Sequence, residues 1–252
     1  MNLRFTVVTV CFHAEKEIAK TIESVLGQSY APYEYLIFDG RSEDRTVEIA
    51  ESYRARFAEK GIRYVVTSER DNGIYHAMNK GVKAATGDFI SFLNAGDWYE
   101  ADALFKVNAC YQKAAFDLSY GGLYYRNPNG TVIIKKSRPD KLLVTSRHWN
   151  HPSMFLRREI YQSYGFDERF RTYADFHLYT KLRRTDIRIR VMDEVLTNFS
   201  VGGVSTDVRM RKVLARGREK YRIYRDNGYG ALYWLEAYGW EILKSLYFRL
   251  AR

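Results

Sequence analysis

The chain has 252 residues, with 46% hydrophobic and 28% charged side chains, a composition typical of a globular protein with a substantial core. Its net charge is +10, and residues 207–252 carry +6 of it, with eleven Lys and Arg against five Asp and Glu. No run of 18 uncharged apolar residues occurs, which excludes a helix that crosses a bilayer.

The first 95 residues alternate between strand and helix patterns. The opening MNLRFTVVTV runs straight into a strand, so no signal peptide is expected. Strands are predicted over residues 5–11, 33–39, 62–67 and 88–93, with helices around 18–26, over 43–58 and around 74–82. Three strand–helix–strand steps in this length predict a doubly wound α/β domain. Cys11 and Cys110 lack metal or redox spacing and are interpreted as reduced thiols of a cytoplasmic protein.

The middle of the chain shows a mixed pattern. Short strands are predicted over 118–124 and 131–134, on either side of an Asn-Pro-Asn-Gly turn. A strand over 151–157, a helix over 175–184 and a strand pair at 187–192 and 195–200 follow. No linker interrupts this region, and a long helical segment begins after about residue 203.

Polar residues stand at the ends of the first strands. Asp39 closes the second strand, Asp71 lies in the loop before the third helix, and the fourth strand runs into Asn94–Asp97. Ligands of such sheets bind beyond the carboxyl ends of the strands. The loop after the first strand contains no glycine, which disfavours dinucleotide oxidoreductases, P-loop NTPases and sugar nucleotidyltransferases.

Four segments together resemble the family 2 glycosyltransferases with the GT-A fold. They are TVVTVCFHAEKEIAKTIESVLGQSY, YLIFDGRSEDRT, ERDNGIYHAMNKGVKAATGDFISFLNAGDWY and HPSMFLRREIYQSYGFDERFRTYADFHLYTKL. The resemblance spans residues 4–205 and implies a GT-A type doubly wound mixed sheet flanked by helices, with a C-terminal helical extension. It divides the catalytic domain, residues 1–205, into a nucleotide-binding half at 1–97 and an acceptor half at 98–205.

The resemblance also implies a nucleotide site. Phe12 would stack near the base, Asp39 and Asp71 would accept hydrogen bonds from the nucleoside, and Lys80 would favour the diphosphate by its charge. Core packing is the alternative for Phe12, and a solvated helix face is the alternative for Lys80. The remaining residues assigned to this site are Thr9, Asn94 and Ala95.

Two further roles follow from the same resemblance. The family's Asp-x-Asp motif binds Mg²⁺ or Mn²⁺, but here Asn94 and Gly96 occupy the carboxylate positions. Asp97 is therefore the metal candidate, with His151 as a weaker one whose alternative is a structural histidine. Asp175, in TYADFHLYTKL, matches the catalytic base of inverting members, and the alternative is a helix N-cap.

Residues 206–252 are predicted to form a basic amphipathic helical tail. Leucine and isoleucine recur on one helical face, with Trp and Tyr beside them and Lys and Arg at the rim; the recurring positions are Leu232, Leu235, Ile242, Leu246 and Leu250. This pattern is typical of a helix that lies on an anionic membrane surface. The alternative is a helix pair packed on the catalytic domain or on another subunit. The loop at 199–206 resembles a flexible segment that closes over the substrates.

The resemblance implies an inverting transferase that moves a sugar from a UDP-sugar to a lipid-linked or oligosaccharide acceptor. It places the chain in polysaccharide biosynthesis, lipopolysaccharide included, as a peripheral protein on the inner face of the membrane. The alternatives are a sugar nucleotidyltransferase on a related fold and a basic nucleic-acid-binding module. The charge lies mostly outside the α/β part, so no nucleic-acid partner is expected. A homo-oligomer stays open.

Overall fold

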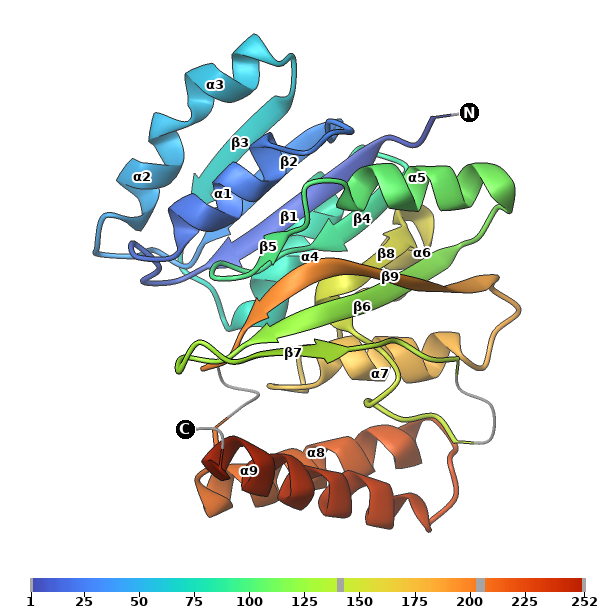
Figure 1. The fold of residues 1–252 in the computed structure, drawn as a ribbon. Helices are drawn as coiled ribbons and strands as arrows, with labels where there is room; N and C mark the ends of the chain where they lie inside the picture. The colour runs from blue at the N-terminus through green and yellow to red at the C-terminus, as the bar shows by residue number, and fades with distance from the viewer. Residues whose placement is uncertain (1, 140–142, 203–206, 251–252) are drawn as a thin grey trace.

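The computed structural model describes residues 2–139, 143–202 and 207–250, and the predicted mixed sheet flanked by helices is confirmed (Figure 1). The strands of these residues are β1 (Phe5–Cys11), β2 (Glu34–Asp39), β3 (Arg63–Ser68), β4 (Phe89–Phe92), β5 (Trp98–Tyr99), β6 (Leu118–Arg126), β7 (Val132–Lys135), β8 (Met154–Arg157) and β9 (Ile189–Ser200). They form one sheet in the order β3-β2-β1-β4-β8-β6-β9-β5, with β7 paired to β6.

The parallel part of the sheet positions the strand ends. β1 pairs in parallel with β2 and β4, and β2 pairs in parallel with β3. Every residue of β1, β2 and β4 is buried, as expected for strands covered on both faces. The carboxyl ends of these strands therefore meet at one edge. β8 then pairs antiparallel with β4 and β6, which makes the sheet mixed.

The helices cover both faces of the sheet. They are α1 (Ile18–Leu26), α2 (Thr46–Ser52), α3 (Arg54–Glu59), α4 (Ile74–Ala84), α5 (Ala103–Lys113), α6 (Arg158–Tyr164), α7 (Ala174–Leu182), α8 (Met210–Asp226) and α9 (Trp240–Leu250), with a short 3₁₀ helix at His151–Ser153 and a π-helical turn at Leu235–Gly239. Apolar residues of α1, α2, α3 and α5 form one core with one face of the sheet. Those of α4, α6, α7 and α8 form the other. No helix of the described residues is long and apolar enough to cross a membrane.

Three sequence predictions about elements were wrong in detail. The helix expected over 43–58 is two helices, because Tyr53 ends α2 and begins α3. The strand pair expected at 187–200 is the single strand β9, which follows β6 in parallel with a register shift near Gly122. The strand expected over 151–157 starts only at Met154, because Pro152 lies in a 3₁₀ turn that precedes it. The sequence reading also did not predict α5, α6 and β5.

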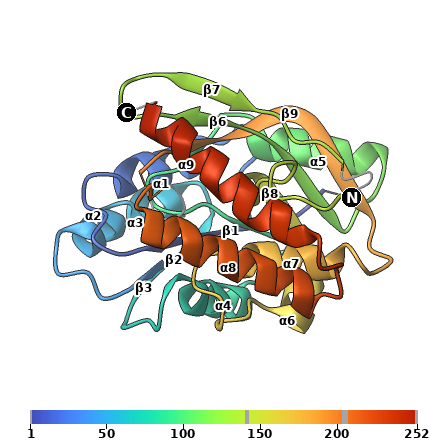
Figure 2. The same ribbon diagram turned by 90° about the horizontal axis from the view of Figure 1, so that it is seen from below.

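The C-terminal helices pack against the domain beneath α7 and β7 (Figures 1 and 2). Ile223, Tyr224 and Ala237 are fully buried and belong to the same apolar core as α4 and α7. A Cβ atom on Gly217 would lie 2.6 Å from the Tyr238 ring, so α8 and the π-helical turn approach at a distance that only glycine permits. Packing on the domain, the alternative to a helix that lies on a membrane surface, is therefore observed for α8.

Candidate active site

Phe12 and Asp71 meet at the carboxyl edge of the parallel strands. Phe12 follows β1 and is 61% exposed, which is unusual for a large apolar side chain and rules out the alternative of core packing. Gly40 follows β2 and separates the two side chains: a Cβ there would lie 3.2 Å from the Phe12 ring and 3.7 Å from Asp71 Oδ2. An open aromatic ring next to a carboxylate is an arrangement that a planar, hydrogen-bonding base could use.

Asp39 organises the loop after β2, beside Phe12. It is 1% exposed, and its two oxygens accept bonds from Ser42 N at 2.8 Å, Ser42 Oγ at 2.5 Å and Ser68 Oγ at 2.6 Å. The thiol of Cys11 lies 3.7 Å from Asp39 Oδ1, and burial followed by this carboxylate raises the pKa of that thiol. Asp39 is thus a buried, well-satisfied carboxylate at the ligand edge.

Asp71 forms a second polar group with the start of α4. Its Oδ1 lies 3.0 Å from His76 Nδ1 and 2.6 Å from Lys80 Nζ. Lys80 also pairs with Glu69 at 2.8 Å. Burial alone would lower the pKa of Lys80, but the bonds to Asp71 and Glu69 raise it. The solvated alternative for Lys80 does not hold, because its ammonium group lies between two carboxylates.

The loops after β1 and β2 each contain a residue other than glycine in a left-handed backbone conformation. His13 has φ 50° and Arg41 has φ 65°. His13 N donates to Ser42 Oγ at 2.8 Å, which ties the loop after β1 to the loop after β2. Such conformations cost free energy and persist where the surroundings fix them, often at functional sites.

Asp175 lies in the first turn of α7 with 17% of its side chain exposed. Its Oδ1 accepts from Phe176 N at 2.8 Å and lies 2.9 Å from the hydroxyl of Tyr75, which also reaches Thr172 O at 2.7 Å. Its Oδ2 faces His151 Nδ1 at 3.7 Å. Burial lowers the pKa of His151 while Asp175 opposes the shift, so the imidazole beside this carboxylate is neutral at pH 7.

Helix α4 joins these two groups. Tyr75 contacts Asp175, and the next residue, His76, contacts Asp71. The predicted nucleotide carboxylate and the predicted base are therefore held by adjacent residues of one rigid helix.

The Asn94–Asp97 segment differs from the predicted arrangement. Thr9 is fully buried, with its hydroxyl bonded to Tyr35 and Leu93 O, so it is not brought to the strand edge. Asp97 is 5% exposed and accepts from Ser200 N at 3.0 Å. Burial raises the pKa of Asp97 to about 8, although the hydrogen bond from Ser200 N lowers it.

Asn94 and Ala95 continue alongside β1 and are half-buried, and Ala95 N donates to Val10 O. Asn94 Oδ1 is buried and has no hydrogen-bond partner among the described residues. Those residues contain no group of three His, Cys, Asp or Glu that could hold a metal ion. A divalent cation therefore fits this donor set poorly unless the donor's phosphate oxygens complete it. Of the predicted loop at 199–206, residues 203–206 lie outside the described part.

Several residues of this region were missed by the sequence reading. Tyr75, His76, Ser42 and Ser68 each contact a predicted carboxylate. Ser42 follows β2 closely and Ser68 is the last residue of β3, so both could have been identified from the strand ends. Tyr75 could not, because its partner lies 100 residues away in the sequence.

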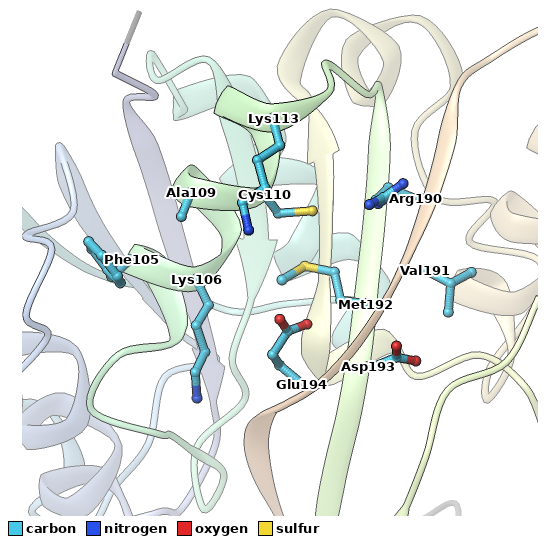
Figure 3. A pocket seen from close by; sticks show the side chains of 10 residues that line it. All are labelled: Phe105, Lys106, Ala109, Cys110, Lys113, Arg190, Val191, Met192, Asp193 and Glu194. Atoms are coloured by element: carbon cyan, nitrogen blue, oxygen red, sulfur yellow. The ribbon is translucent and has the colours of Figure 1, made fainter.

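A separate groove of about 220 Å³ lies between α5 and β9 (Figure 3). Its lining residues are Phe105, Lys106, Ala109, Cys110, Lys113, Arg190, Val191, Met192, Asp193 and Glu194. None of the candidate active-site residues lines it. It is therefore not part of the candidate active site.

Comparison with known proteins identifies the family. The family model described as glycosyl transferase family 2 matches residues 6–189. A "PGL/p-HBAD biosynthesis glycosyltransferase" from Mycobacterium bovis is 28% identical over 221 residues, which cover 84% of this chain and 83% of the relative. A dolichyl N-acetyl-alpha-D-glucosaminyl phosphate glycosyltransferase from Methanococcus voltae is 33% identical over 110 residues, 43% of this chain and 34% of that protein.

Solved structures agree on the fold. S. aureus TarS 1-349 in complex with UDP aligns with a TM-score of 0.63 and 18% identity, covering 96% of this chain and 71% of that one. The mannosyltransferase PcManGT from Pyrobaculum calidifontis, in complex with GDP-Man and Mn²⁺, aligns with a TM-score of 0.65 and 16% identity, covering 100% and 75%. Both neighbours are GT-A glycosyltransferases, so the predicted fold class is confirmed.

Proposed function

Because the chain belongs to glycosyl transferase family 2 and is a glycosyltransferase, we propose that it transfers a sugar from a UDP-sugar, with inversion, to a lipid-linked or oligosaccharide acceptor. The proposal rests on the start of α4, where the Tyr75 hydroxyl donates to Asp175 and the His76 ring contacts Asp71. A base and a nucleotide pocket that share one helix turn suit a reaction between two substrates bound side by side.

In the proposed step Asp175 takes the proton of an acceptor hydroxyl. The hydroxyl oxygen forms a bond to the anomeric carbon, the bond from that carbon to the diphosphate breaks, and UDP leaves from the opposite face. The hydroxyl of Tyr75 and the backbone N–H of Phe176 fix Oδ1, which leaves Oδ2 to accept the proton. The neutral His151 beside Oδ2 adds no positive charge that would weaken the base.

We retain Asp39, Asp71, Phe12 and Lys80 as the proposed nucleotide contacts. Phe12 supplies an open ring, and the two aspartates supply acceptors for base and ribose hydroxyls. Lys80 stays paired to Asp71, so its proposed contribution is to fix that carboxylate rather than to bind the diphosphate alone. Asp97 and Asn94 supply too few ligands to hold Mg²⁺ or Mn²⁺ by themselves, so in the proposed step a cation would bind only together with the phosphate oxygens of the donor.

We further propose that the chain lies peripherally on the cytoplasmic face of a membrane. In the C-terminal region Leu232, Trp234 and Leu235 are exposed, as are Ile242 and Leu246 on α9. An exposed apolar strip on a basic helix pair is the pattern of an interfacial helix. The side chain of Leu250, the last residue of the predicted stripe, lies outside the part of the chain that the structure describes. These apolar side chains would then contact the lipid of the bilayer that holds the acceptor.

An assay of sugar transfer tests the proposed function. Purified chain is incubated with UDP-sugars and a lipid-linked acceptor extract, and UDP release and the anomeric configuration of the product are measured by NMR. We expect UDP release that requires acceptor and a product inverted relative to the donor. Retention of configuration would contradict the role of Asp175, and pyrophosphate release from a sugar phosphate and UTP would instead support the nucleotidyltransferase alternative.

A further inference from the structure

The C-terminal helices bring a group of cations close to Asp175. α8 contributes Arg216 and Lys220, α9 contributes Lys244, and β7 contributes Lys135. We call these four residues the basic cluster. Arg216 is 4% exposed and Lys220 is fully buried, although both lie in the helix predicted from sequence to be a basic surface. Lysine and arginine are rarely buried unless they are paired.

One carboxylate serves most of the cluster. Glu241 of α9 is 1% exposed and accepts from Arg216 Nε at 2.7 Å, Lys220 Nζ at 3.0 Å and the Tyr173 hydroxyl at 2.6 Å. Burial alone would raise the pKa of Glu241, but Lys220, Lys244 and Arg216 lower it to about 2. Both cations of α8 therefore bond directly to Glu241, whereas Lys244 interacts with it only through its charge.

The other two cations have no carboxylate of their own. Lys135 Nζ donates to two backbone carbonyls, Ser146 O at 3.3 Å and Trp149 O at 3.0 Å. Lys244 has no hydrogen bond or ion pair with any of the described residues 2–139, 143–202 and 207–250. Burial, followed by repulsion from neighbouring cations, lowers the pKa of Lys135 to about 7; burial, partly offset by Glu241, lowers that of Lys244 to about 8.

Nearby carboxylates are engaged elsewhere. Glu219 accepts from the backbone N–H groups of Thr172 and Tyr173. Glu236 accepts from hydroxyls of Thr145 and Tyr224, and Asp207 pairs with Arg209. Around Lys135 and Lys244 the remaining carboxylate is Asp175, which raises the pKa of both. Arg216 and Lys220 thus share Glu241, whereas the half-buried Lys135 and Lys244 have no carboxylate bonded to them among the described residues, so a bound anion would supply the counter-charge that these two lysines lack.

The cluster is continuous with the base. Lys135 binds the carbonyl of Trp149, two residues before His151, and His151 faces Asp175 at 3.7 Å. His151 is 7% exposed, and its Nε2 has no hydrogen-bond partner among the described residues. The side chain that faces the base therefore has a buried polar atom without a partner, as expected where a ligand completes a site.

We propose that the basic cluster binds a phosphate group of the acceptor, with Lys244 as its free cation. A phosphate monoester or diphosphate brings more negative charge than a single carboxylate, which suits an excess shared by two lysines. The inference rests on the proposed inverting reaction. In that reaction base and leaving group lie on opposite faces of the anomeric carbon, so cations grouped with Asp175 lie on the acceptor side, away from the donor's diphosphate.

The experiment measures binding of hexyl phosphate to the full chain saturated with UDP, by calorimetry. The variants are Lys244→Gln, Lys244→Arg and, as a matched control, Lys212→Gln, which removes an exposed cation of α8. We expect Lys244→Gln to bind hexyl phosphate about tenfold more weakly, as for loss of a charge-assisted hydrogen bond. Lys244→Arg and Lys212→Gln should bind as the wild type does.

The outcomes separate the sources of phosphate. Equal binding of hexyl phosphate by Lys244→Gln and wild type would overturn the proposal, as would no binding by wild type. Weaker binding of UDP, but not of hexyl phosphate, would assign the cluster to the donor and also overturn it. Inorganic phosphate as a second probe shows whether the alkyl chain contributes. If wild type fails to bind UDP, the proposed donor fails, while hexyl phosphate binding still tests the cluster. Melting of Lys244→Gln at or above the wild-type temperature shows that it folds.

Discussion

The two sides of the candidate active site differ in how completely their charged groups are paired or hydrogen-bonded. At the strand ends Asp39 is satisfied by Ser42 and Ser68, and Asp71 is satisfied by His76 and Lys80. On the helical side Arg216 and Lys220 pair with Glu241. Lys135 and Lys244 interact with Asp175 only through their charges. We call the proposed nucleotide side balanced because its carboxylates are hydrogen-bonded before any ligand arrives; on the proposed acceptor side Lys244 has no such partner among the described residues.

This difference has a consequence for how each side would bind. A balanced, hydrogen-bonded pocket is preorganised, so a ligand there gains affinity from shape and new hydrogen bonds at little cost of rearrangement. An unbalanced cationic pocket gains affinity from charge neutralisation, and an anion that binds it also stabilises the fold.

The largest effect is expected for Glu241→Gln. The change keeps the side-chain volume but leaves Arg216 and Lys220 buried without a counter-charge, and removing one partner of a buried ion pair costs about 3–5 kcal/mol of unfolding free energy. Chemical denaturation measures the loss. Asp226→Asn is the matched control, since it breaks an exposed pair with Arg222 on the same region and should change stability little. Equal stability of Glu241→Gln and wild type would mean that the helical side is not short of negative charge.

A smaller effect, on the rate, is expected for Asp175→Asn. The amide oxygen can still accept from Phe176 N and Tyr75, so the geometry persists while the proton acceptor is lost. Turnover should fall by about a hundredfold or more, with affinity for UDP unchanged. Steady-state kinetics and calorimetry measure the two quantities. Asp186→Asn, an exposed change shortly after α7, is the control. Turnover above about a tenth of wild type would remove Asp175 from the role of base.

How much of this could be predicted depends on the sequence distance between partners. Asp39 and Asp71 could be proposed because a strand end is a local pattern, and Asp175 could be proposed from its motif. The basic cluster was not found, because Arg216 and Lys220 look like solvated helix charges until Glu241 and β7 are packed against them. Asp97 was assigned to a metal from its motif alone, and its burial against Ser200 depends on β9, 103 residues away.

The smallest effect is expected for Asp39→Ala, which tests the balanced side. Asp39 both closes the loop at Ser42 and offers acceptors at the ligand edge, so its loss should weaken UDP binding about tenfold, the size of one hydrogen bond to a charged group. Ser68→Ala is the control because it removes one bond to Asp39 and keeps the carboxylate. Calorimetry with UDP separates the two roles. If Ser68→Ala weakens binding as much as Asp39→Ala, then Asp39 acts by holding the loop. If neither variant changes the affinity, the nucleotide does not use this strand end, and the contrast between the two sides would have to rest on Asp71 and Phe12.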